Sequence, residues 1–181
     1  EPRAFRFIDA PRPGADALVR GLLAQGKRVI LLSGDTREAV SALAETLGIV
    51  DWRAGVLPAD KARVVAALSD KGRKVLMVGD GLNDTAALAG AHVSISPSSA
   101  LDAARSASDI VLLGQDLSPI ADALRIAVQA RRRIKQNFAL SLAYNVVAVP
   151  VALVGLATPL IAALAMSTSS VTVSLNALRL K

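Results

Sequence analysis

VLMVGDGLNDTAAL, residues 75–88, is the stretch of this 181-residue chain that decides its fold. Its first four residues are apolar and stop at Gly79, and two carboxylates and an amide follow at once. A short run of Val, Leu and Met without alternation is typical of a strand buried on both faces, as in a parallel sheet. In such sheets ligands bind at the carboxyl ends of the strands. The stretch therefore predicts a strand end that carries three oxygen ligands: Asp80, Asn83 and Asp84.

Similar apolar runs recur on both sides of this stretch. Strands are expected at FRFID (5–9), VILLSGD (29–35), VSIS (93–96) and DIVLL (109–113). Helices are expected between them over residues 13–25, 36–47 and 58–70. Gly26 and Gly48 follow the first two helices, where a C-cap glycine belongs. This alternation predicts a doubly wound α/β domain with a parallel sheet.

A second strand end also carries polar groups. VILLSGD ends in Ser33, Gly34 and Asp35. The Ser33 hydroxyl can donate to a phosphate oxygen, and Gly34 lets a backbone N–H approach closely. Lys61, near the start of the helix at 58–70, can neutralise a phosphoryl charge. These residues predict a phosphate site at the edge of the sheet.

Each of these signals has an ordinary structural explanation. An Asp after a strand is commonly a turn or cap residue, and a lysine on a helix is commonly solvated. Ser33-Gly34-Asp35 alone would suit a turn between a strand and a helix. In combination, the carboxylates that follow Gly79 supply the hard oxygen ligands that Mg²⁺ prefers, beside groups suited to phosphate. The order and spacing of the segments favour a joint magnesium and phosphate site.

The charges are distributed unevenly along the chain. The net charge is +6, yet all 15 acidic residues precede residue 123, and residues 138–178 carry no charge. The excess of basic residues flanks this apolar block, at 131–135 and at 179 and 181. A nucleic-acid site would spread its basic residues over the folded domain, so the pattern suits a membrane boundary better. The chain has no cysteine, which excludes disulfides and thiolate ligands within it.

The apolar block contains two stretches, residues 138–154 and 160–178, separated by GLATP. A long helix over residues 116–136 is expected to lead into the first. Each stretch is close to the length of about twenty residues that spans a bilayer. A buried hairpin of a soluble protein is the alternative, but such long helices rarely lack every charge. The basic flanks predict that the α/β domain and the C-terminus are cytoplasmic. The missing initiator Met suggests that residue 1 lies inside a longer protein.

The chain resembles the haloacid-dehalogenase superfamily, and within it the P-type ATPases, through GDGLND (79–84), SGD (33–35) and PADK (58–61). The resemblance implies that Asp80 is a Mg²⁺ ligand assisted by Asn83 and Asp84. It implies that Ser33 and Lys61 contact the phosphoryl group, while Gly34 and Asp35 belong to the matched motif. It implies ATP as phosphoryl donor. The family's phosphorylated Asp, in an Asp-Lys-Thr-Gly-Thr motif, is not in this sequence, so the chain alone is expected to be inactive.

The resemblance also divides the chain and suggests an ion. It implies a partial phosphorylation domain at 1–136 and a transmembrane helical hairpin at 137–181. Tyr144-Asn145 and Met166 with Ser170 resemble the signature of copper-transporting heavy-metal ATPases. A thioether beside neutral oxygens suits Cu(I) better than Zn²⁺, which favours a carboxylate. Packing by Met and Ser is the alternative.

The expected partners are membrane lipid, the remaining domains of a pump and, as a further candidate, a copper chaperone, in a bacterial inner or plasma membrane. Nucleic acid is not expected. One rival function is a membrane-tethered phosphatase of the same superfamily. A second is a noncatalytic membrane-anchored regulatory module. His92, which precedes a strand, is expected to be structural rather than a metal ligand.

Overall fold

The computed structural model describes residues 11–100 and 102–179. It consists of two compact units that divide between Ala121 and Asp122, and each is described by itself. The strand expected at residues 5–9 lies outside the described residues. The boundary expected between residues 136 and 137 marks the start of the apolar block and stays a prediction for where the chain enters a membrane.

The first unit contains short parallel strands in two sheets. The strands in the described part of the chain are β1 (Ile30–Leu32), β2 (Asp51–Arg53), β3 (Leu76–Val78), β4 (Val93–Pro97) and β5 (Ile110–Leu112). β1 pairs with β2, and β3, β4 and β5 form the second sheet in that order. All three pairings are parallel. The parallel α/β architecture expected from the sequence is confirmed, with four of the expected strands in place.

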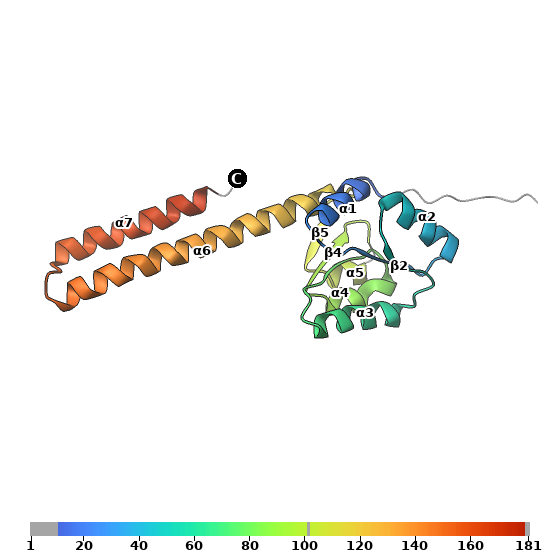
Figure 1. Ribbon diagram of the computed structural model, residues 1–181, viewed down its shortest axis with the longest axis horizontal. Coiled ribbons are helices and arrows are strands. Elements are labelled where there is room, and N and C mark those ends of the chain that lie inside the picture. The colour runs from blue at the N-terminus through green and yellow to red at the C-terminus, as the bar shows by residue number, and fades with distance from the viewer. Residues whose placement is uncertain (1–10, 101, 180–181) are drawn as a thin grey trace, which may run out of the picture. The chain divides into compact units, whose positions relative to one another are not determined.

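Helices connect the strands. Their bounds are α1 (Ala15–Ala24), α2 (Arg37–Leu47), α3 (Pro58–Asp70), the 3₁₀ turn η1 (Leu82–Asp84), α4 (Thr85–Gly90) and α5 (Asp102–Ser106). The Thr36 side chain caps α2 by accepting from the N–H of Ala39, and Gly48 ends the helix with a φ of 67°. Pro58 opens α3, where its fixed φ suits the first turn. Figure 1 shows these helices covering the strands of the first unit.

Each sheet has its own apolar core. On the first sheet, buried residues of α1 and α2 pack together with Ile49, and Leu31 of β1 lies against them. On the second, Leu88 of α4 packs with Ala100 and Ala104, next to Met77 of β3. These cores hold the ends of β1 and β3 in place. They are the two strands whose end residues are predicted to bind phosphate and magnesium.

The second unit is a helical hairpin. α6 runs from Ser118 to Leu153, and α7 runs from Pro159 to Leu178, so α6 begins in the first unit and continues into the second. Both helices are long and apolar enough to cross a membrane. The turn between them places Gly155 at a φ of 77°, and the Thr158 side chain caps α7. Figure 1 shows α7 running back beside α6.

Candidate functional site

The strand end of β3 is built around a buried carboxylate. The chain leaves β3 through Gly79 and Gly81 and turns into η1, where the N–H of Asp84 donates to the carbonyl of Gly81 at 3.0 Å. A Cβ atom at Gly79 would lie 2.8–3.0 Å from the Asp84 side chain. Glycine at position 79 is therefore needed because the Asp84 carboxylate lies against the backbone there. Asp84 itself is only 7% exposed.

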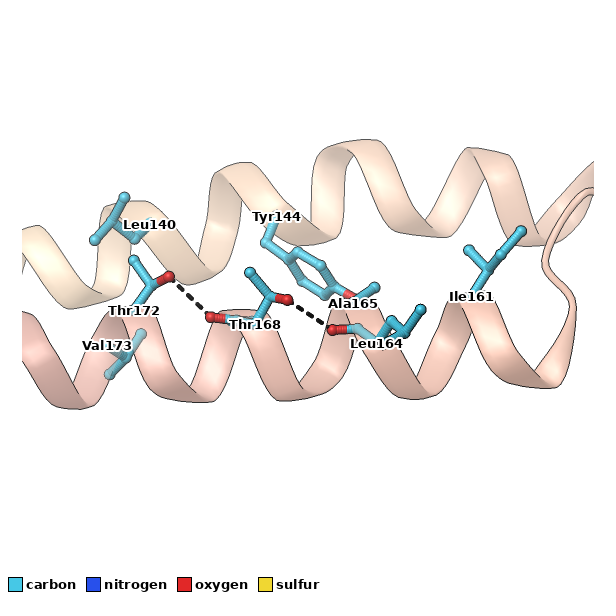
Figure 2. Close-up of a pocket in the computed structure, with 9 residues that line it drawn as sticks. Leu140, Tyr144, Ile161, Leu164, Ala165, Thr168, Thr172 and Val173 are labelled. Carbon is cyan, nitrogen blue, oxygen red and sulfur yellow. Dashed lines mark hydrogen bonds between the residues drawn. The ribbon is translucent and has the colours of Figure 1, made fainter.

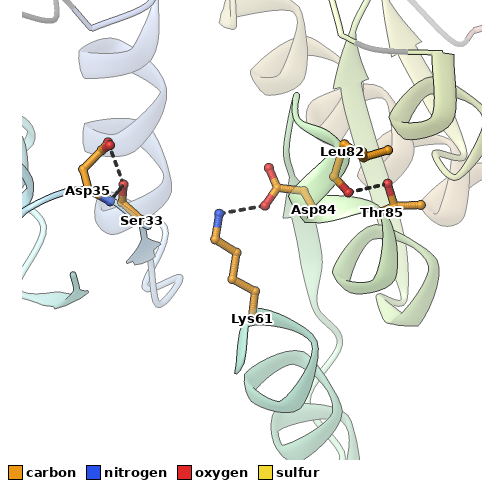
Figure 3. Close-up of polar contacts among 6 residues, drawn as sticks. All are labelled: Ser33, Asp35, Lys61, Leu82, Asp84 and Thr85. Atoms are coloured by element: carbon orange, nitrogen blue, oxygen red, sulfur yellow. Dashed lines mark hydrogen bonds and ion pairs between the residues drawn. The ribbon is translucent and has the colours of Figure 1, made fainter. Parts of the chain in front are cut away.

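Lys61 supplies the counter-charge for this carboxylate. Its Nζ lies 2.8 Å from Oδ1 of Asp84, and both side chains are nearly buried, at 12% and 10% exposure. Figure 3 shows Lys61 reaching from the start of α3 to the loop that follows β3. Two residues that the sequence singled out from separate motifs are thus brought into direct contact. A pair this well buried is costly to break because the remaining charge has little access to water.

The second carboxylate of the strand end is more open. Asp80 pairs with the guanidinium of Arg12, from the segment that precedes α1, and their side chains are 52% and 32% exposed. Asn83 lies exposed in η1. Asp80 and Asn83 therefore present oxygen atoms at the surface of the strand end, whereas Asp84 is held beneath them by Lys61.

Ser33 and Asp35 form a separate pair after β1. Oγ of Ser33 donates to the Asp35 carboxylate at 2.9 Å and accepts from the N–H of Asp35 at 3.2 Å. Gly34 has room for close approach, with the carbonyl of Val56 as its neighbour at 3.5 Å from an added Cβ. Figure 3 shows this pair and the Lys61–Asp84 pair as two distinct groups. The loop after β1 thus carries the hydroxyl, the turn after β3 carries the carboxylates, and no hydrogen bond joins the two groups among the described residues.

The donor set fits Mg²⁺. This ion takes one or two carboxylates, keeps several waters and binds phosphate oxygens, so a large acidic cluster is not required. Within the described ranges no group of three acidic or histidine side chains gathers to hold a metal. Asp80 is accessible and Asn83 is exposed beside it, so these two would hold the ion, with Asp84 close below.

A hydrogen-bond network holds β4 beside β5. The Asp109 carboxylate accepts from both the N–H and the hydroxyl of Ser94, at 2.8 and 2.9 Å. These two bonds, first from the backbone and then from the side chain, lower the pKa of Asp109 below its ordinary value. The N–H of His92 donates to the carbonyl of Val75 at 3.0 Å, next to the start of β3.

The hairpin contains a cleft of about 520 Å³ between α6 and α7. Tyr144 lines it from α6, facing Ala165 and Thr168 of α7 (Figure 2). The hydroxyls of Thr168 and Thr172 donate to carbonyls one turn earlier in their own helix, at 2.8 Å each. The cleft is therefore mostly apolar, and two of the α7 hydroxyls that line it are already bonded within the helix.

The other residues expected to contact a transported ion lie elsewhere on the helices. Met166 is 71% exposed, and neither it nor Ser170 lines the cleft. The Asn145 amide donates to the carbonyl of Ser141 at 2.9 Å and is exposed. Met166 and Ser170 share a face of α7, as their spacing predicts, but that face is turned away from Tyr144. The hairpin by itself does not bring the four residues together.

Two further features were missed by reasoning from the sequence. Arg12 stands between two prolines, and no periodicity or spacing pointed to its contact with Asp80. Asn137 and Asn176 lie at the edges of the apolar stretches, and the amide of Asn176 donates to Oδ1 of Asn137 at 2.7 Å. No bond between these two amides was predicted from the sequence, although polar side chains in neighbouring spans commonly hydrogen-bond across helices.

Comparison with known proteins assigns the chain and its fold to a family. Residues 2–92, about half of the chain, match the family model of the haloacid dehalogenase-like hydrolases. The chain therefore belongs to the haloacid dehalogenase-like hydrolase family. The match includes the residues after β1 and β3 and the start of α3.

Relatives extend the likeness to the whole chain. Nitrogen fixation protein FixI of Rhizobium meliloti (strain 1021) is 47% identical over 181 residues, covering 100% of this chain and 24% of that protein. The copper-exporting P-type ATPase of Bacillus subtilis (strain 168) is 44% identical over 156 residues, which cover 86% of this chain and 20% of that protein. The chain thus spans about a quarter of the length of these relatives or less.

The similarity to one solved structure extends over both units of this chain. The crystal structure of a zinc-transporting PIB-type ATPase in its E2.Pi state matches with a TM-score of 0.88 and 32% identity, covering 95% of this chain and 28% of that one. The resemblance to heavy-metal P-type ATPases is confirmed, as is an α/β domain followed by two long apolar helices. The helices and these relatives support a membrane-integral protein. The names differ in metal, copper in one and zinc in the other.

Proposed function

We propose that this chain is part of an ATP-driven heavy-metal transporter that passes through an aspartyl-phosphate intermediate. The observation that carries the proposal is the buried Lys61–Asp84 pair at the end of β3, in a chain that continues into an apolar hairpin. A lysine and carboxylates at one strand end suit phosphoryl transfer, in which charge neutralisation and positioning supply most of the catalysis.

Each residue of the proposed phosphoryl site would have its own role. Asp80, assisted by Asn83 and Asp84, would hold Mg²⁺, which neutralises charge on the phosphoryl oxygens when bound. The Ser33 hydroxyl would donate to a phosphoryl oxygen, and Gly34 would let the backbone approach it. Asp35 orients Ser33 through the 2.9 Å hydrogen bond between them. Lys61 holds Asp84 in place and adds positive charge beside the transferred group.

The phosphorylated aspartate would come from outside this sequence. The site residues lie after β1 and after β3, and no ladder joins these two strands among the residues that the structure describes. Each therefore has an edge that a further parallel strand could pair with. A strand ending in the acceptor aspartate at that position would place it between Ser33 and Asp80. ATP would be bound by other parts of the full protein.

The hairpin would contribute to the path of the metal. We propose Cu(I), with Tyr144, Asn145, Met166 and Ser170 as contributing residues. Residues 138–178 contain no carboxylate, and Met166 is the one soft ligand in this range. Since Met166 and Ser170 are exposed on α7, they would face other membrane helices of the pump, which would complete the metal site.

The basic residues at 131–135 and at 179 favour a cytoplasmic α/β domain and C-terminus, with the 155–159 turn on the other side. A reporter fused in that turn should be extracytoplasmic, and one after residue 181 cytoplasmic. Both reporters on one side would contradict a spanning hairpin. The remaining pump domains and lipid would be direct partners, and a copper chaperone would deliver the ion.

Metal-stimulated ATP hydrolysis by the full-length protein tests this proposal. Cu(I) should stimulate the wild type more strongly than Zn²⁺. Met166→Ala should raise the half-maximal Cu(I) concentration at least about tenfold, since even supporting residues of metal sites change affinity by that factor. Val171→Ala, which shortens an exposed side chain of the same helix, is the matched control and should behave as wild type. Stimulation by Zn²⁺ alone, or an unchanged Met166→Ala response, would contradict the choice of metal.

This assay, together with measurements of phosphate-ester hydrolysis and of phosphoenzyme formation, separates the rival functions. A membrane-tethered phosphatase would hydrolyse small phosphate esters without metal stimulation and without ATP. A noncatalytic regulatory module would form no phosphoenzyme and would not need Mg²⁺ at Asp80. The TM-score of 0.88 with a metal-transporting ATPase over 95% of the chain favours the transporter.

A further inference from the structure

A segment of three residues, Arg12 to Gly14, connects the candidate magnesium site to the start of α6. We call it the strap. At one end, the guanidinium of Arg12 pairs with the Asp80 carboxylate. The carbonyl of Arg12 accepts from the N–H of Ala15 at 3.1 Å, which fixes the strap to the first turn of α1.

The other end of the strap contacts the residues that begin α6. The carbonyl of Pro13 accepts from the N–H of Leu117 at 2.9 Å. Gly14 has a φ of +77°, and a Cβ atom there would lie 2.4 Å from both Oδ1 of Asp116 and Oγ of Ser118. The backbone of Gly14 is therefore packed directly against the turn that opens α6.

That turn is itself well ordered by hydrogen bonds. Oδ1 of Asp116 accepts from the N–H of Ser118 at 2.8 Å and from its hydroxyl at 2.7 Å. Leu117 packs against the apolar core formed by α1 and α2. A displacement of the strap would thus act on a defined structure at the start of α6, and the proline ring leaves the strap little freedom to absorb it locally.

The Asp80 carboxylate has two competing uses. It is the accessible carboxylate that would hold Mg²⁺, and it is also the partner of Arg12. A cationic guanidinium and a divalent cation bound to the same carboxylate repel each other, so occupancy by one weakens occupancy by the other. The pair is partly exposed, so a metal ion could displace Arg12 at modest cost.

We propose that Arg12 is a positioning residue that holds Asp80 until Mg²⁺ binds, and that the strap transmits this exchange to the start of α6. The inference rests on the proposed function, because it takes Asp80 as the magnesium ligand. It gives the catalytic site a direct structural connection, through three consecutive residues, to the helix that continues into the hairpin.

The first test is Mg²⁺ binding by the full-length protein without nucleotide, measured by calorimetric titration. Arg12→Ala should bind Mg²⁺ about two- to fivefold more tightly, the range expected for removing a partly exposed ion pair. Arg12→Lys keeps the charge and should stay close to wild type. Arg20→Ala is the matched control, since Arg20 pairs with Asp16 on its own helix and is exposed. Weaker or unchanged binding by Arg12→Ala would overturn the inference.

The second test is hydrogen exchange of the Leu117 amide, in a peptide covering residues 115–120. In wild type, Mg²⁺ should accelerate exchange, because release of Arg12 loosens the bond from Leu117 to Pro13. In Arg12→Ala, exchange should already be fast and should not respond to Mg²⁺. Asp80→Asn should exchange as Arg12→Ala does and should also lose Mg²⁺ binding. Identical, Mg²⁺-responsive exchange in wild type and Arg12→Ala would overturn transmission through the strap.

These outcomes separate the inference from the proposed function. If wild type binds no Mg²⁺, both are wrong. If wild type binds Mg²⁺, Asp80→Asn loses it, and Arg12→Ala matches wild type in both tests, the magnesium site stands and the role of Arg12 is wrong.

Discussion

The polar side chains of the two units have different kinds of hydrogen-bonding and ion-pair partners. In the α/β unit, several charged groups pair with partners from other elements, as Lys61 of α3 pairs with Asp84 of η1. In the hairpin, the side chains of Asn145, Thr168 and Thr172 instead donate to carbonyls of their own helix. The contacts of Lys61 with Asp84 and of Arg12 with Asp80 are therefore made within this chain. The hairpin does not bring Met166 and Ser170 to the cleft lined by Tyr144, so further helices would be needed to form the proposed metal site.

The comparison predicts the largest stability effect at the buried pair of the α/β unit. Lys61→Ala would leave the Asp84 carboxylate buried without a counter-charge, which should cost about 3–5 kcal/mol. The expected result is a clear fall in the thermal unfolding midpoint of that unit. Lys71→Ala, an exposed lysine at the end of the same helix, is the control and should have little effect. Equal midpoints for the two variants would show that the pair contributes no stability.

The next effect is expected where α1 and α6 meet. Gly14→Ala combines a positive φ with contacts of 2.4 Å to Asp116 and Ser118, and should destabilise by about 1–3 kcal/mol or more. Gly26→Ala is a matched control, since Gly26 has a φ of +69° but nothing within 4 Å of an added Cβ. Thermal unfolding of both variants separates backbone strain from the close contact. If Gly26→Ala is equally destabilising, the packing of Gly14 is not important.

A smaller effect is expected in the hairpin. Asn176→Ala removes the 2.7 Å amide bond to Asn137 and should cost about 0.6–2 kcal/mol, the range found between membrane helices. Asn137→Ala should cost the same, and the double variant should be no worse than either, because all three remove one bond. Unfolding of the purified protein in detergent measures this. Ser174→Ala is the control, and additive losses would contradict a shared bond.

The smallest effect is a change in pH dependence. The pKa of Asp109 is lowered from about 3.8 in the folded protein, so its charged form stabilises the fold above pH 4. That contribution is lost as the pH falls through the lowered pKa. Asp109→Asn should therefore reduce the unfolding midpoint at pH 6–7, and its difference from wild type should shrink below pH 4. Asp102→Asn, at a largely exposed carboxylate, is the control. A difference that does not vary with pH would contradict the assignment.

The sequence predicted most of the α/β framework because its strands are continuous apolar runs that end in polar motifs. β2 was missed because Trp52 is its one apolar residue, between the charged Asp51 and Arg53, and because its pairing with β1 depends on contacts far apart in the chain. The short helices α4 and α5 were missed because five or six residues carry no clear helical period.

The candidate site was predictable in composition but not in pairing. Motif spacing placed Lys61 and Asp84 near the same strand end, yet the contact between them needs the path of α3. Arg12 gave no signal, because its role depends on where an irregular segment crosses the sheet edge. In the hairpin, the four-residue spacing of Met166 and Ser170 predicted a shared face. It could not show that this face points away from Tyr144, since helix rotation is set by packing.

The central claim is that Asp80 holds Mg²⁺ for phosphoryl transfer, and phosphoenzyme formation tests it most directly. The full-length protein would be incubated with radiolabelled ATP and Mg²⁺, and acid-stable label would be counted in wild type, Asp80→Asn and Asp70→Asn. Asp70 is an exposed carboxylate at the end of α3 and serves as the control. We expect wild type and Asp70→Asn to form a Mg²⁺-dependent phosphoenzyme and Asp80→Asn to form none above background. Wild-type levels in Asp80→Asn would contradict the claim.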